Sequence, residues 1–450
     1  MIDSVEDTIA AVATPEGNSA LGVVRVTGPR AIDIAGRATD NPHRFCSFNA
    51  REANLVRLVD EQGHVLDQAV ALLWRAPASY TGEDLVEFSC HGGRAVLRSV
   101  YDRLVDLGAR PAGPGEFTQR AFLNGKMSLD EAEAVAALIE ARTTTAVRAA
   151  ARMMQGGMRA RVEELQQRLL DLLARVELSL DFVEEELELE TAEVTINRTR
   201  SLHDDLTQLR QQFKAGRLLR EGARIVIAGA PNAGKSTLLN RLAGHERALV
   251  SETPGTTRDY LDVVLDWNGL PVHLYDTAGL RESADMIERA GTDRTNALMK
   301  EADLVIWLVA PPEPSLPPSS LSAGPPLLRV VNKYDLSPGQ ELADRLEDVD
   351  LAISATTGEG VESLQHLVSD RLLEGYNPDS VILWESRHDR LLSDTSAALE
   401  RAITVLETGS ALELIAVELR TALDTLGQIT GRSHSEELLH HIFANFCIGK

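Results

Sequence analysis

The chain has 450 residues, of which 44% are hydrophobic and 25% are charged. It is too long for one ordinary core and too apolar for a disordered protein, so we expect two or three domains. There are 45 Lys and Arg residues against 68 Asp and Glu residues. The resulting net charge of −23 excludes a surface that binds nucleic-acid phosphates everywhere and leaves only a local basic patch open.

Cysteine usage and hydropathy indicate the compartment. Cys46, Cys90 and Cys447 are odd in number and far apart, which disfavours a disulfide framework and a CxxC-type zinc site. No apolar stretch reaches the roughly 18 residues of a membrane span. Residues 1–24 contain no Lys or Arg and no apolar run of signal-peptide length. We therefore expect a cytoplasmic protein without a membrane segment.

The N-terminal region has a mixed pattern. Short β-branched runs at 21–26 and 69–74 are broken by Gly, Pro and Asn, which predicts an α+β domain over residues 1–124. From Leu129 onward Gly and Pro become rare, and apolar residues recur at spacings of three and four. That spacing predicts a long helix in a helical region over 125–220, with its stripe at Val162, Leu165, Leu169, Leu172, Val176, Leu180 and Val183.

An acidic run separates this helix from the α/β part of the chain. Residues 181–190 carry six acidic side chains in ten positions, and a solvated helix face or loop is favoured over a cation site. The continuous apolar run 225–228 then predicts a buried parallel strand. Similar runs at 272–275, 304–309 and 327–331 alternate with helix-length polar stretches, which predicts a doubly wound α/β domain over 221–375.

The last part of the chain returns to helical texture. Residues 311–326 hold seven prolines and one glycine, so they predict an irregular or polyproline loop rather than a crossover helix. Over 376–450 a helix seam is formed by Leu412, Ile415, Leu419, Leu423 and Leu426. Helical regions on both sides of the α/β unit suggest that it is inserted into a helical domain, with two independent helical bundles as the alternative.

A phosphate-binding motif comes directly after the run 225–228. Residues 229–236 read GAPNAGKS, the pattern GxxxxGK[ST] between a strand and a helix. Glycines let backbone N–H groups converge on a β-phosphate at the helix N-terminus, Lys235 adds charge toward the β and γ oxygens, and Ser236 offers a hydroxyl to Mg²⁺. The predicted nucleotide contacts here are Asn232, Ala233, Gly234, Lys235, Ser236 and Thr237.

Three further motifs occur in order along the chain. Asp276-Thr277-Ala278-Gly279 ends the run 272–275, where Asp276 could hold a magnesium-bound water and the Gly279 N–H could meet a γ-phosphate. Alone this segment is equally an ordinary turn, but its distance from the phosphate loop favours the nucleotide. Between the two, Ser251 to Asp259 predicts a mobile loop in which Thr257 ligates Mg²⁺ only beside a γ-phosphate, against a plain surface turn as the alternative.

The last motif predicts guanine rather than adenine. Asn332-Lys333-Tyr334-Asp335 comes after the run 327–331, and the Asp335 carboxylate can accept from the N1 and exocyclic amino groups of guanine. Adenine lacks that pair of donors, so a buried carboxylate would be left unpaired. Ser354, Ala355 and Thr356 complete the base pocket. Together the four motifs predict a guanine-nucleotide switch that binds GTP.

The motifs do not show which residue orients the water that attacks GTP. Leu280 comes after the DTAG motif and cannot orient water by hydrogen bonding, unlike the Gln often found there in small GTPases. Candidate groups for this role are Arg281, Glu282, Asp285 and Glu288. No internal arginine finger is obvious, although Arg258 and Arg281 stay open.

At this point the sequence resembles a family. The segments GAPNAGKST, TPGTTRD, DTAGLRES with Ile287-Glu288-Arg289, TGEDLVEFSCHGG (81–93), PGEFTQRAFLNGKM (114–127) and the terminal FCIGK together are similar to the TrmE-type (MnmE) tRNA modification GTPases over essentially the whole chain. The resemblance implies a multidomain protein: an α+β folate-binding and dimerisation domain over 1–124, an all-α helical domain over 125–220 and 376–450, and an inserted α/β P-loop GTPase domain over 221–375.

The resemblance also implies a potassium-activated mechanism. A monovalent cation would supply the positive charge that an arginine finger supplies elsewhere. The family's catalytic glutamate falls on Glu288, which acts through water. The implied potassium ligands are Asn232, Ser251, Thr253 and Thr256; Mg²⁺ falls to Ser236 and Thr257, and the remaining loop contacts are Glu252, Pro254 and Gly255.

For the ends of the chain the resemblance implies folate chemistry. A 5-formyl- or methylene-tetrahydrofolate would be bound by Arg25, Glu87, Lys126 and Lys450. Cys447 either takes part in the modification chemistry or packs. A lipidation signal is improbable, because Gly449 and Lys450 fit it poorly and no polybasic stretch precedes them.

The function implied is GTP hydrolysis by a homodimer that cooperates with the FAD-dependent MnmG (GidA) protein. Together they add a carboxymethylaminomethyl- or aminomethyl-type group to carbon 5 of the wobble uridine of certain tRNAs. A ribosome-assembly or regulatory GTPase, which needs no folate, is the alternative. A scaffold that binds GTP without turnover is a third interpretation.

Overall fold

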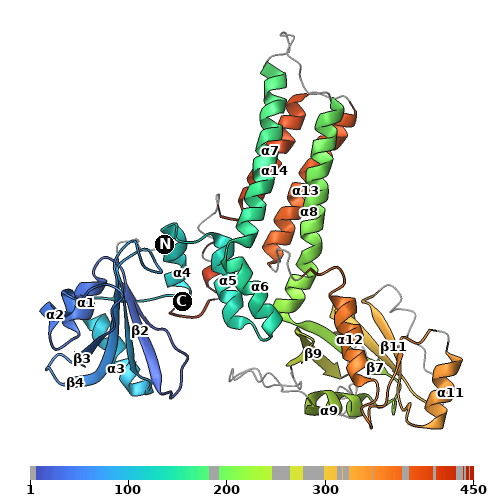
Figure 1. The fold of residues 1–450 in the computed structure, drawn as a ribbon, viewed down its shortest axis with the longest axis horizontal. Helices are drawn as coiled ribbons and strands as arrows, with labels where there is room; N and C mark the ends of the chain where they lie inside the picture. Colours follow the sequence, from blue (N-terminus) through green and yellow to red (C-terminus); the bar gives the residue numbers. More distant parts are fainter. Residues whose placement is uncertain are drawn as a thin grey trace, which may run out of the picture. The chain divides into compact units, whose positions relative to one another are not determined.

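The computed structural model describes residues 7–181, 192–245, 264–276, 298–311, 317, 324–346, 348–377, 385–408, 412–431, 439, 442–444 and 446–449. They fall into two compact units, residues 1–136 with 427–450 and residues 137–426. Figure 1 labels their elements.

Six strands form the sheet of the first unit, in the order β3-β4-β5-β2-β1-β6. The pairing is antiparallel except between β1 and β6, which is parallel. The strands are β1 (Ile9–Val12), β2 (Leu21–Thr27), β3 (Asn54–Val59), β4 (Val65–Trp74), β5 (Leu85–His91) and β6 (Arg110–Pro111).

Helices cover this sheet unequally. One face carries α1 (Ala31–Arg37), α2 (Pro42–Cys46) and α3 (Arg94–Asp106), whose apolar side chains share a core with Ala10, Val24 and Phe88. Because side chains alternate along a strand, Ile9 and Ala11 face the other side, where they pack on Phe117 of α4 (Glu116–Leu123). The first unit is therefore an α+β domain, as predicted.

The C-terminal segment belongs to the first unit. Leu439, Phe443 and Phe446 form a buried cluster with Leu129 and Ala132 of α5 (Leu129–Glu140). Residues more than 300 positions apart in the chain thus share one small core.

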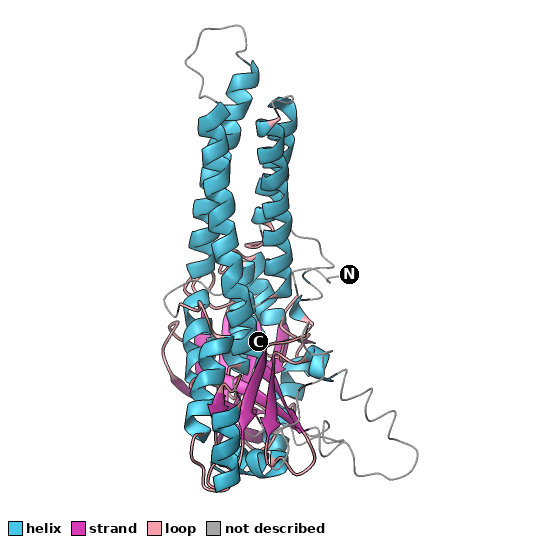
Figure 2. Cartoon of the chain, turned by 90° about the vertical axis from the view of Figure 1, so that its right-hand side faces the viewer, coloured by secondary structure: helices cyan, strands magenta, loops and turns pink. Residues whose placement is uncertain are grey.

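The second unit contains long helices that precede and follow the α/β domain. They are α6 (Thr144–Met154), α7 (Gly157–Asp181), α8 (Ala192–Glu221), α13 (Ser386–Glu407) and α14 (Leu412–Gly427). Figures 1 and 2 show the long helices side by side, with α8 packed on both α7 and α13. Helices from both sides of the α/β domain therefore form one bundle, so the predicted insertion is confirmed and the alternative of independent bundles is wrong.

The predicted stripe explains this bundle. Val162, Leu165, Leu169, Leu172 and Val176 of α7 are all buried, whereas Leu180 is partly exposed. Val183 and most of the acidic run lie outside the described residues. In α14 the seam residues Ile415, Leu419 and Leu426 are buried.

A second six-stranded sheet forms the α/β domain, in the order β12-β11-β10-β7-β9-β8. All pairs are parallel except β8 with β9. The strands are β7 (Ala223–Gly229), β8 (Val264–Trp267), β9 (Leu270–Asp276), β10 (Leu304–Val309), β11 (Leu327–Val331) and β12 (Leu351–Ala352), with helices α9 (Lys235–His245), α11 (Ser337–Arg345) and α12 (Val361–Leu372). Every residue of β10 is buried, as a parallel strand covered on both faces requires.

The register of this sheet brings the predicted motifs to one edge. Gly229 at the end of β7 lies opposite Leu308 of β10, and Asp276 at the end of β9 lies opposite Ile227. Val309 of β10 lies opposite Val331, which directly precedes Asn332. The carboxyl ends of three neighbouring parallel strands therefore meet where α/β sheets bind their ligands.

Candidate functional site

The chain turns sharply between β7 and α9. Gly229, Asn232 and Gly234 all have positive φ angles, of 143°, 62° and 95°. A Cβ on Gly229 would lie 2.2 Å from the Leu308 carbonyl oxygen, and one on Gly234 would lie 2.2 Å from Nδ2 of Asn332. Only glycine fits at these two positions, because both the backbone angle and the close approach exclude a side chain.

Lys235 lies inside the curl of this loop. Its side chain is only 9% exposed, and its ammonium group donates to the carbonyl oxygens of Gly229 at 3.0 Å and Ala230 at 2.8 Å. Ser236 and Thr237 come next in the first turn of α9 with exposed side chains. The loop thus places the Lys235 ammonium group, two exposed hydroxyl residues and the N-terminus of α9 close together. This is the arrangement that binds nucleotide phosphates.

Asn332 joins the phosphate loop (residues 229–236) to the base loop (residues 354–356). This residue is 2% exposed, its Nδ2 donates to the Ala233 carbonyl at 2.8 Å, and its Oδ1 accepts from the Ala355 N–H at 2.9 Å. Both ends of the amide are used by backbone groups of different loops. Asn332 therefore acts as a structural bridge that sets the distance between the phosphate and base sites.

Asp335 is oriented by Ser354. The Ser354 hydroxyl is completely buried, donates to Oδ1 of Asp335 at 2.6 Å, and accepts from the Thr357 N–H at 3.1 Å. Asp335 itself is exposed, and no other residue that the structure describes bonds to its carboxylate. The carboxylate is thus held in one orientation with capacity left to accept from the edge of a base.

A second bridge was not foreseen from the motifs. Arg241 of α9 donates from Nε to the Ala355 carbonyl at 2.6 Å and from a terminal nitrogen to the Thr356 carbonyl. Helix α9, which begins in the phosphate loop, therefore also hydrogen-bonds to the base loop. No local pattern marks Arg241, since the contact spans more than 100 residues of chain.

Part of the predicted site lies outside the described residues. Asp276 ends β9 beside β7, but the structure describes only its backbone. The predicted residues outside the description are Ser251, Glu252, Thr253, Pro254, Gly255, Thr256, Thr257, Thr277, Ala278, Gly279, Glu288 and Lys450. Within the described part of the chain no group of three or more His, Cys, Asp or Glu side chains could hold a metal, and no helix is long and apolar enough to cross a bilayer.

In the first unit the structure brings Arg25 and Glu87 together. They face each other across β2 and β5 and form an ion pair of 2.6 Å between Nη2 and Oε1. Arg25 also donates from Nη1 to the Gly449 carbonyl at 2.9 Å and lies 5.4 Å from the centre of the Phe117 ring. Its Nε is buried and has no hydrogen-bond partner among the residues that the structure describes. Lys126 instead donates to the Pro77 carbonyl at 3.0 Å.

The C-terminal tail reaches this ion pair. The Gly115 N–H donates to the Cys447 carbonyl at 3.3 Å, and Pro114 and Ile448 form an antiparallel bridge. The Cys447 side chain is exposed. Cys90 differs, because burial raises the pKa of its thiol to about 12, so it stays protonated and is a poor nucleophile.

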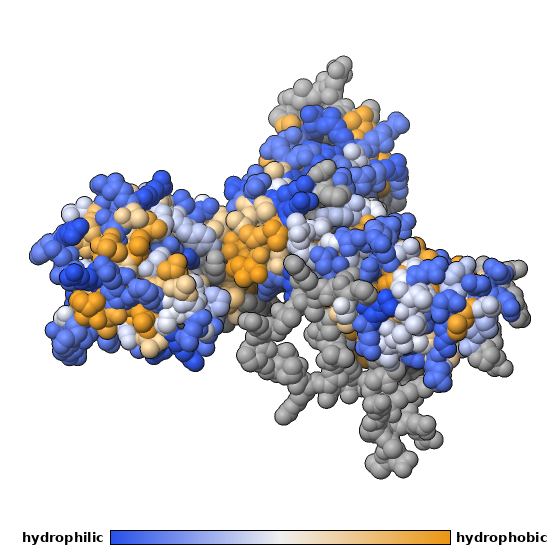
Figure 3. Space-filling model, turned by 60° about the horizontal axis from the view of Figure 1, so that its bottom comes forward, coloured by the Kyte–Doolittle hydropathy of each residue, from blue (hydrophilic) through white to orange (hydrophobic). Residues whose placement is uncertain are grey.

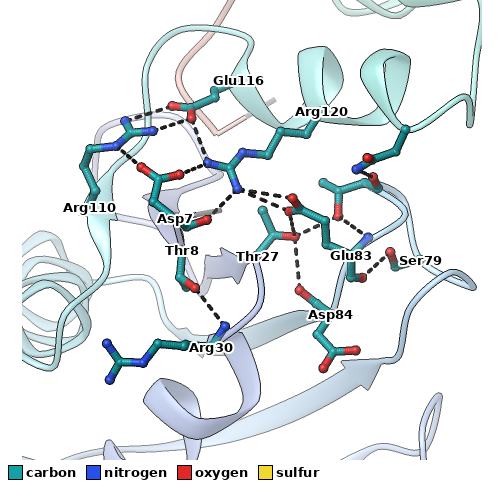
Figure 4. A network of polar contacts seen from close by, with 12 residues as sticks. Asp7, Thr8, Thr27, Arg30, Ser79, Glu83, Asp84, Arg110, Glu116 and Arg120 are labelled. Carbon is teal, nitrogen blue, oxygen red and sulfur yellow. Dashed lines mark hydrogen bonds and ion pairs between the residues drawn. The ribbon is translucent and has the colours of Figure 1, made fainter. Parts of the chain in front are cut away.

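A partly buried ion network is centred on Arg120 (Figure 4). Arg120 donates to the carboxylates of Asp7, Glu83 and Glu116, and Arg110 pairs with Glu116 at 2.5 Å. Burial is the largest influence on the pKa of Glu83 and raises it, with Arg120 offsetting only part. For Glu116 burial also raises the pKa, but hydrogen bonds from Arg110, the Gly113 N–H and Arg120 outweigh it and leave the pKa lowered. The motif PGEFTQR thus supplies one carboxylate, Glu116, and one guanidinium, Arg120, to this ion network.

The comparisons with known proteins agree with this geometry. The family model of the MnmE helical domain matches residues 129–447, and that of the GTP-binding protein TrmE N-terminus matches residues 8–126. The tRNA modification GTPase MnmE of Chlorobium luteolum is 44% identical over 463 residues, which cover 98% of this chain and 97% of the relative. That of Thermus thermophilus is 44% identical over 452 residues, which cover 99% and 100%.

Among solved structures, the G domain of the T. maritima FeoB iron transporter is 25% identical and covers 34% of this chain and 99% of that chain, with a TM-score of 0.25. That score is too low to support an argument. The two family models together span nearly the whole sequence, and the relatives match it from end to end. This chain therefore belongs to the MnmE (TrmE) family of tRNA modification GTPases.

Proposed function

We propose that this protein hydrolyses GTP to drive the addition of a carboxymethylaminomethyl- or aminomethyl-type group to carbon 5 of the wobble uridine of certain tRNAs. The observation that carries the GTP part is the oriented Asp335 carboxylate, held by Ser354 at 2.6 Å and tied through Asn332 to the phosphate loop. A guanine base offers two donors to that carboxylate, whereas adenine offers none in the same place.

The described residues fit the metals that such a site uses. The exposed Ser236 hydroxyl lies in the first turn of α9, at the sheet edge where β9 ends in Asp276, and hydroxyl and carboxylate oxygens suit Mg²⁺. The exposed Asn232 carries a side-chain oxygen on the same loop, which suits K⁺. When bound, these cations would neutralise charge on the phosphates. The proposed ligand set for Mg²⁺ is completed by Thr257, and that for K⁺ by Ser251, Thr253 and Thr256.

Glu288 is our proposed catalytic residue, assigned by family resemblance. In small GTPases a Gln at the position of Leu280 often orients the attacking water, and Leu280 cannot do so. The Glu288 carboxylate, acting through water, would fill that role. Glu288→Ala should abolish stimulated hydrolysis while GDP affinity stays near that of the parent. Comparable loss of GDP binding would show that Glu288 supports the fold instead.

Folate is proposed as the one-carbon donor. The buried Nε of Arg25 has no hydrogen-bond partner in the described chain, so a ligand acceptor there would satisfy it. Glu87 offers a carboxylate that can accept from the amino and ring N–H groups of a pterin, and Arg25 holds that carboxylate at 2.6 Å. Lys126 and Lys450 would join this site, and a formyl- or methylene-tetrahydrofolate would supply the one-carbon unit.

We further propose a cytoplasmic homodimer that works with the FAD-dependent MnmG protein. On the first unit Leu21, Leu55, Val65 and Val70 are exposed by 66%, 61%, 58% and 38%. Leu55 and Val70 are direct cross-strand neighbours, which supports burial of this sheet face against a second copy. Figure 3 shows hydrophobic residues among hydrophilic ones on the surface of this domain. Residues 1–124 would serve dimerisation and folate binding, and residues 221–375 would bind GTP. Residues 125–220 and 376–450 would link them, and the end of the second segment packs in the first unit.

Two measurements test the proposal. Asp335→Asn should weaken GDP binding by about 10- to 100-fold, because the amide keeps one acceptor oxygen but turns a donor toward the second guanine donor, and a charge-assisted hydrogen bond worth about 1.5–3 kcal/mol is lost. Cells that lack the protein should lose the modified wobble uridine in nucleoside mass spectrometry, and the Asp335→Asn gene should fail to restore it. Normal nucleosides in the deletion strain would favour the assembly GTPase instead.

A further inference from the structure

One stretch of the helical domain departs from the acidic character of the chain. Residues 141–162 contain five arginines and no acidic residue, in a protein whose net charge is −23. The arginines are Arg142, Arg148, Arg152, Arg159 and Arg161. The stretch covers the residues just before α6, α6 itself and the start of α7.

Helix α6 buries one face and exposes the other. Its buried side consists of small or flexible apolar residues, Ala146, Ala149, Ala150 and Met153. Arg142 and Arg148 are exposed, and so are the neighbouring Val147 and Met154, by 41% and 44%. The start of the helix is fixed, because the Thr143 hydroxyl accepts from the Ala146 N–H at 3.2 Å and donates to the Gly269 carbonyl at 2.8 Å.

Most other arginines of this unit have acidic partners. Arg161 pairs with Asp205 at 3.1 Å, and Arg159 pairs with Glu163 at 3.1 Å. At the end of α8, a second arginine-rich stretch is neutralised by Asp303, Glu385 and Asp389. By contrast, the side chains of Arg142 and Arg148 make no ion pair or hydrogen bond with any residue in the described ranges.

Unpaired, exposed guanidinium groups on a helix and just before its N-cap suit phosphate groups. Arginine stays charged and presents a planar fork that matches phosphate oxygens in pairs. A stretch without acidic residues of its own also weakens locally the repulsion that the net charge of this protein exerts on a polyanion. The partner of this chain that carries many phosphates is the tRNA itself.

We propose that Arg142, which lies just before the N-cap of α6, and Arg148, on the exposed side of α6, form a contact surface for the tRNA backbone. This inference rests on the proposed function, because it names where the tRNA substrate meets this chain. Phosphate contacts position an RNA without reading its sequence, so the surface would hold different tRNAs alike and leave the choice of uridine to other groups.

The test is tRNA binding by the full-length protein, with an unmodified transcript that has uridine at the wobble position. Binding is followed between about 50 and 200 mM salt, where phosphate contacts dominate the affinity. Arg142→Ala/Arg148→Ala should weaken binding about tenfold or more and lower the salt slope by about two, because each phosphate contact contributes about one to that slope. Arg142→Lys/Arg148→Lys should keep most of the slope.

The matched control is Arg390→Ala. Arg390 is an exposed arginine of α13 without an ion pair to any described residue, next to Asp389. It should leave both affinity and slope unchanged. Unchanged GDP affinity in all variants shows that they are folded.

Affinity and slope within twofold of the parent in the double alanine variant would overturn the proposal. So would absence of tRNA binding by the parent chain, or a defect confined to association with the FAD-dependent partner, which would make α6 a protein interface. Each of these results can occur while the deletion strain still loses its modified uridine, so the proposed function would survive them. If the deletion strain keeps its modified wobble uridine while tRNA binding still depends on Arg142 and Arg148, the proposed function would be refuted and the tRNA contact surface would stand.

Discussion

Removing the second bridge between the phosphate and base loops, by Arg241→Ala, should weaken nucleotide binding without any contact to the nucleotide. Arg241 places Nε 2.6 Å from the Ala355 carbonyl oxygen and donates a second bond to Thr356. In the variant, the bond of Asn332 with the Ala355 N–H at 2.9 Å would remain as the bridge from the phosphate loop to residues 354–356. The loop that carries Ser354, and through it Asp335, would lose part of its support.

The size of the effect comes from these contacts. A hydrogen bond from a charged donor contributes about 1.5–3 kcal/mol. Because Arg241 is partly exposed and water can replace it at both carbonyls, we take about 1.5 kcal/mol for the two bonds together. That energy corresponds to a roughly tenfold increase in Kd. Since only the base side is affected, GDP and a non-hydrolysable GTP analogue should lose affinity by the same factor.

The assay is equilibrium titration with a fluorescent guanine nucleotide, beside a thermal unfolding curve for each protein. Arg241→Lys should lose less affinity, because one ammonium group can still reach a carbonyl. Arg224→Ala, an exposed arginine at the start of β7 that lies 4.0 Å from Glu301, is the control and should change nothing. A Kd within twofold of the parent for Arg241→Ala, or a loss only for the triphosphate, would refute the reasoning.

Three further substitutions test other parts of the structure. Gly234→Ala should abolish GDP binding, measured by the same titration, because its Cβ would lie 2.2 Å from Nδ2 of Asn332. Glu116→Gln should lower the free energy of unfolding at neutral pH by about 1–3 kcal/mol in urea titrations, because Arg110 loses a charged partner. Burial raises the pKa of the parent carboxyl, but hydrogen bonds from Arg110, the Gly113 N–H and Arg120 outweigh it and leave the folded pKa below its ordinary value. The contribution is therefore present above the unfolded pKa and is lost as pH falls through the folded value. The difference should shrink on acidification, and a constant difference would contradict the reasoning. Cys447→Ser should remove the wobble modification in cells, because the thiol is exposed and accessible for chemistry, and unchanged nucleosides would exclude a role of the thiol in the modification.

Local patterns predicted the α/β domain because each of its signals is contained in a short segment. The runs 225–228 and 304–309 are buried strands, since continuous apolar residues suit a parallel sheet covered on both sides. The predicted stripe of α7 is buried at five positions. The fold class was predictable for the same reason, because helical and strand periods are properties of neighbouring residues.

Several features of the sites required the folded chain. Nothing in the local sequence around Arg241 or Asn332 indicates which carbonyl each will contact, because those partners lie about 100 residues away. The ion pair of Arg25 with Glu87 depends on the strand order, and the Gly449 carbonyl beside it comes from the other end of the chain. Lys126 was grouped with them by family resemblance alone, and in the structure it bonds to Pro77.

The sequence by itself determined that this chain has one α/β domain within helices, and its motifs predict which groups meet phosphate and base. Only the tertiary structure decided which charges are neutralised. Arg120 and Arg161 are paired with carboxylates, whereas Arg142 and Arg148 are left exposed without partners in the described chain. The reason is physical, since an ion pair depends on distances of a few ångströms that only packing brings about.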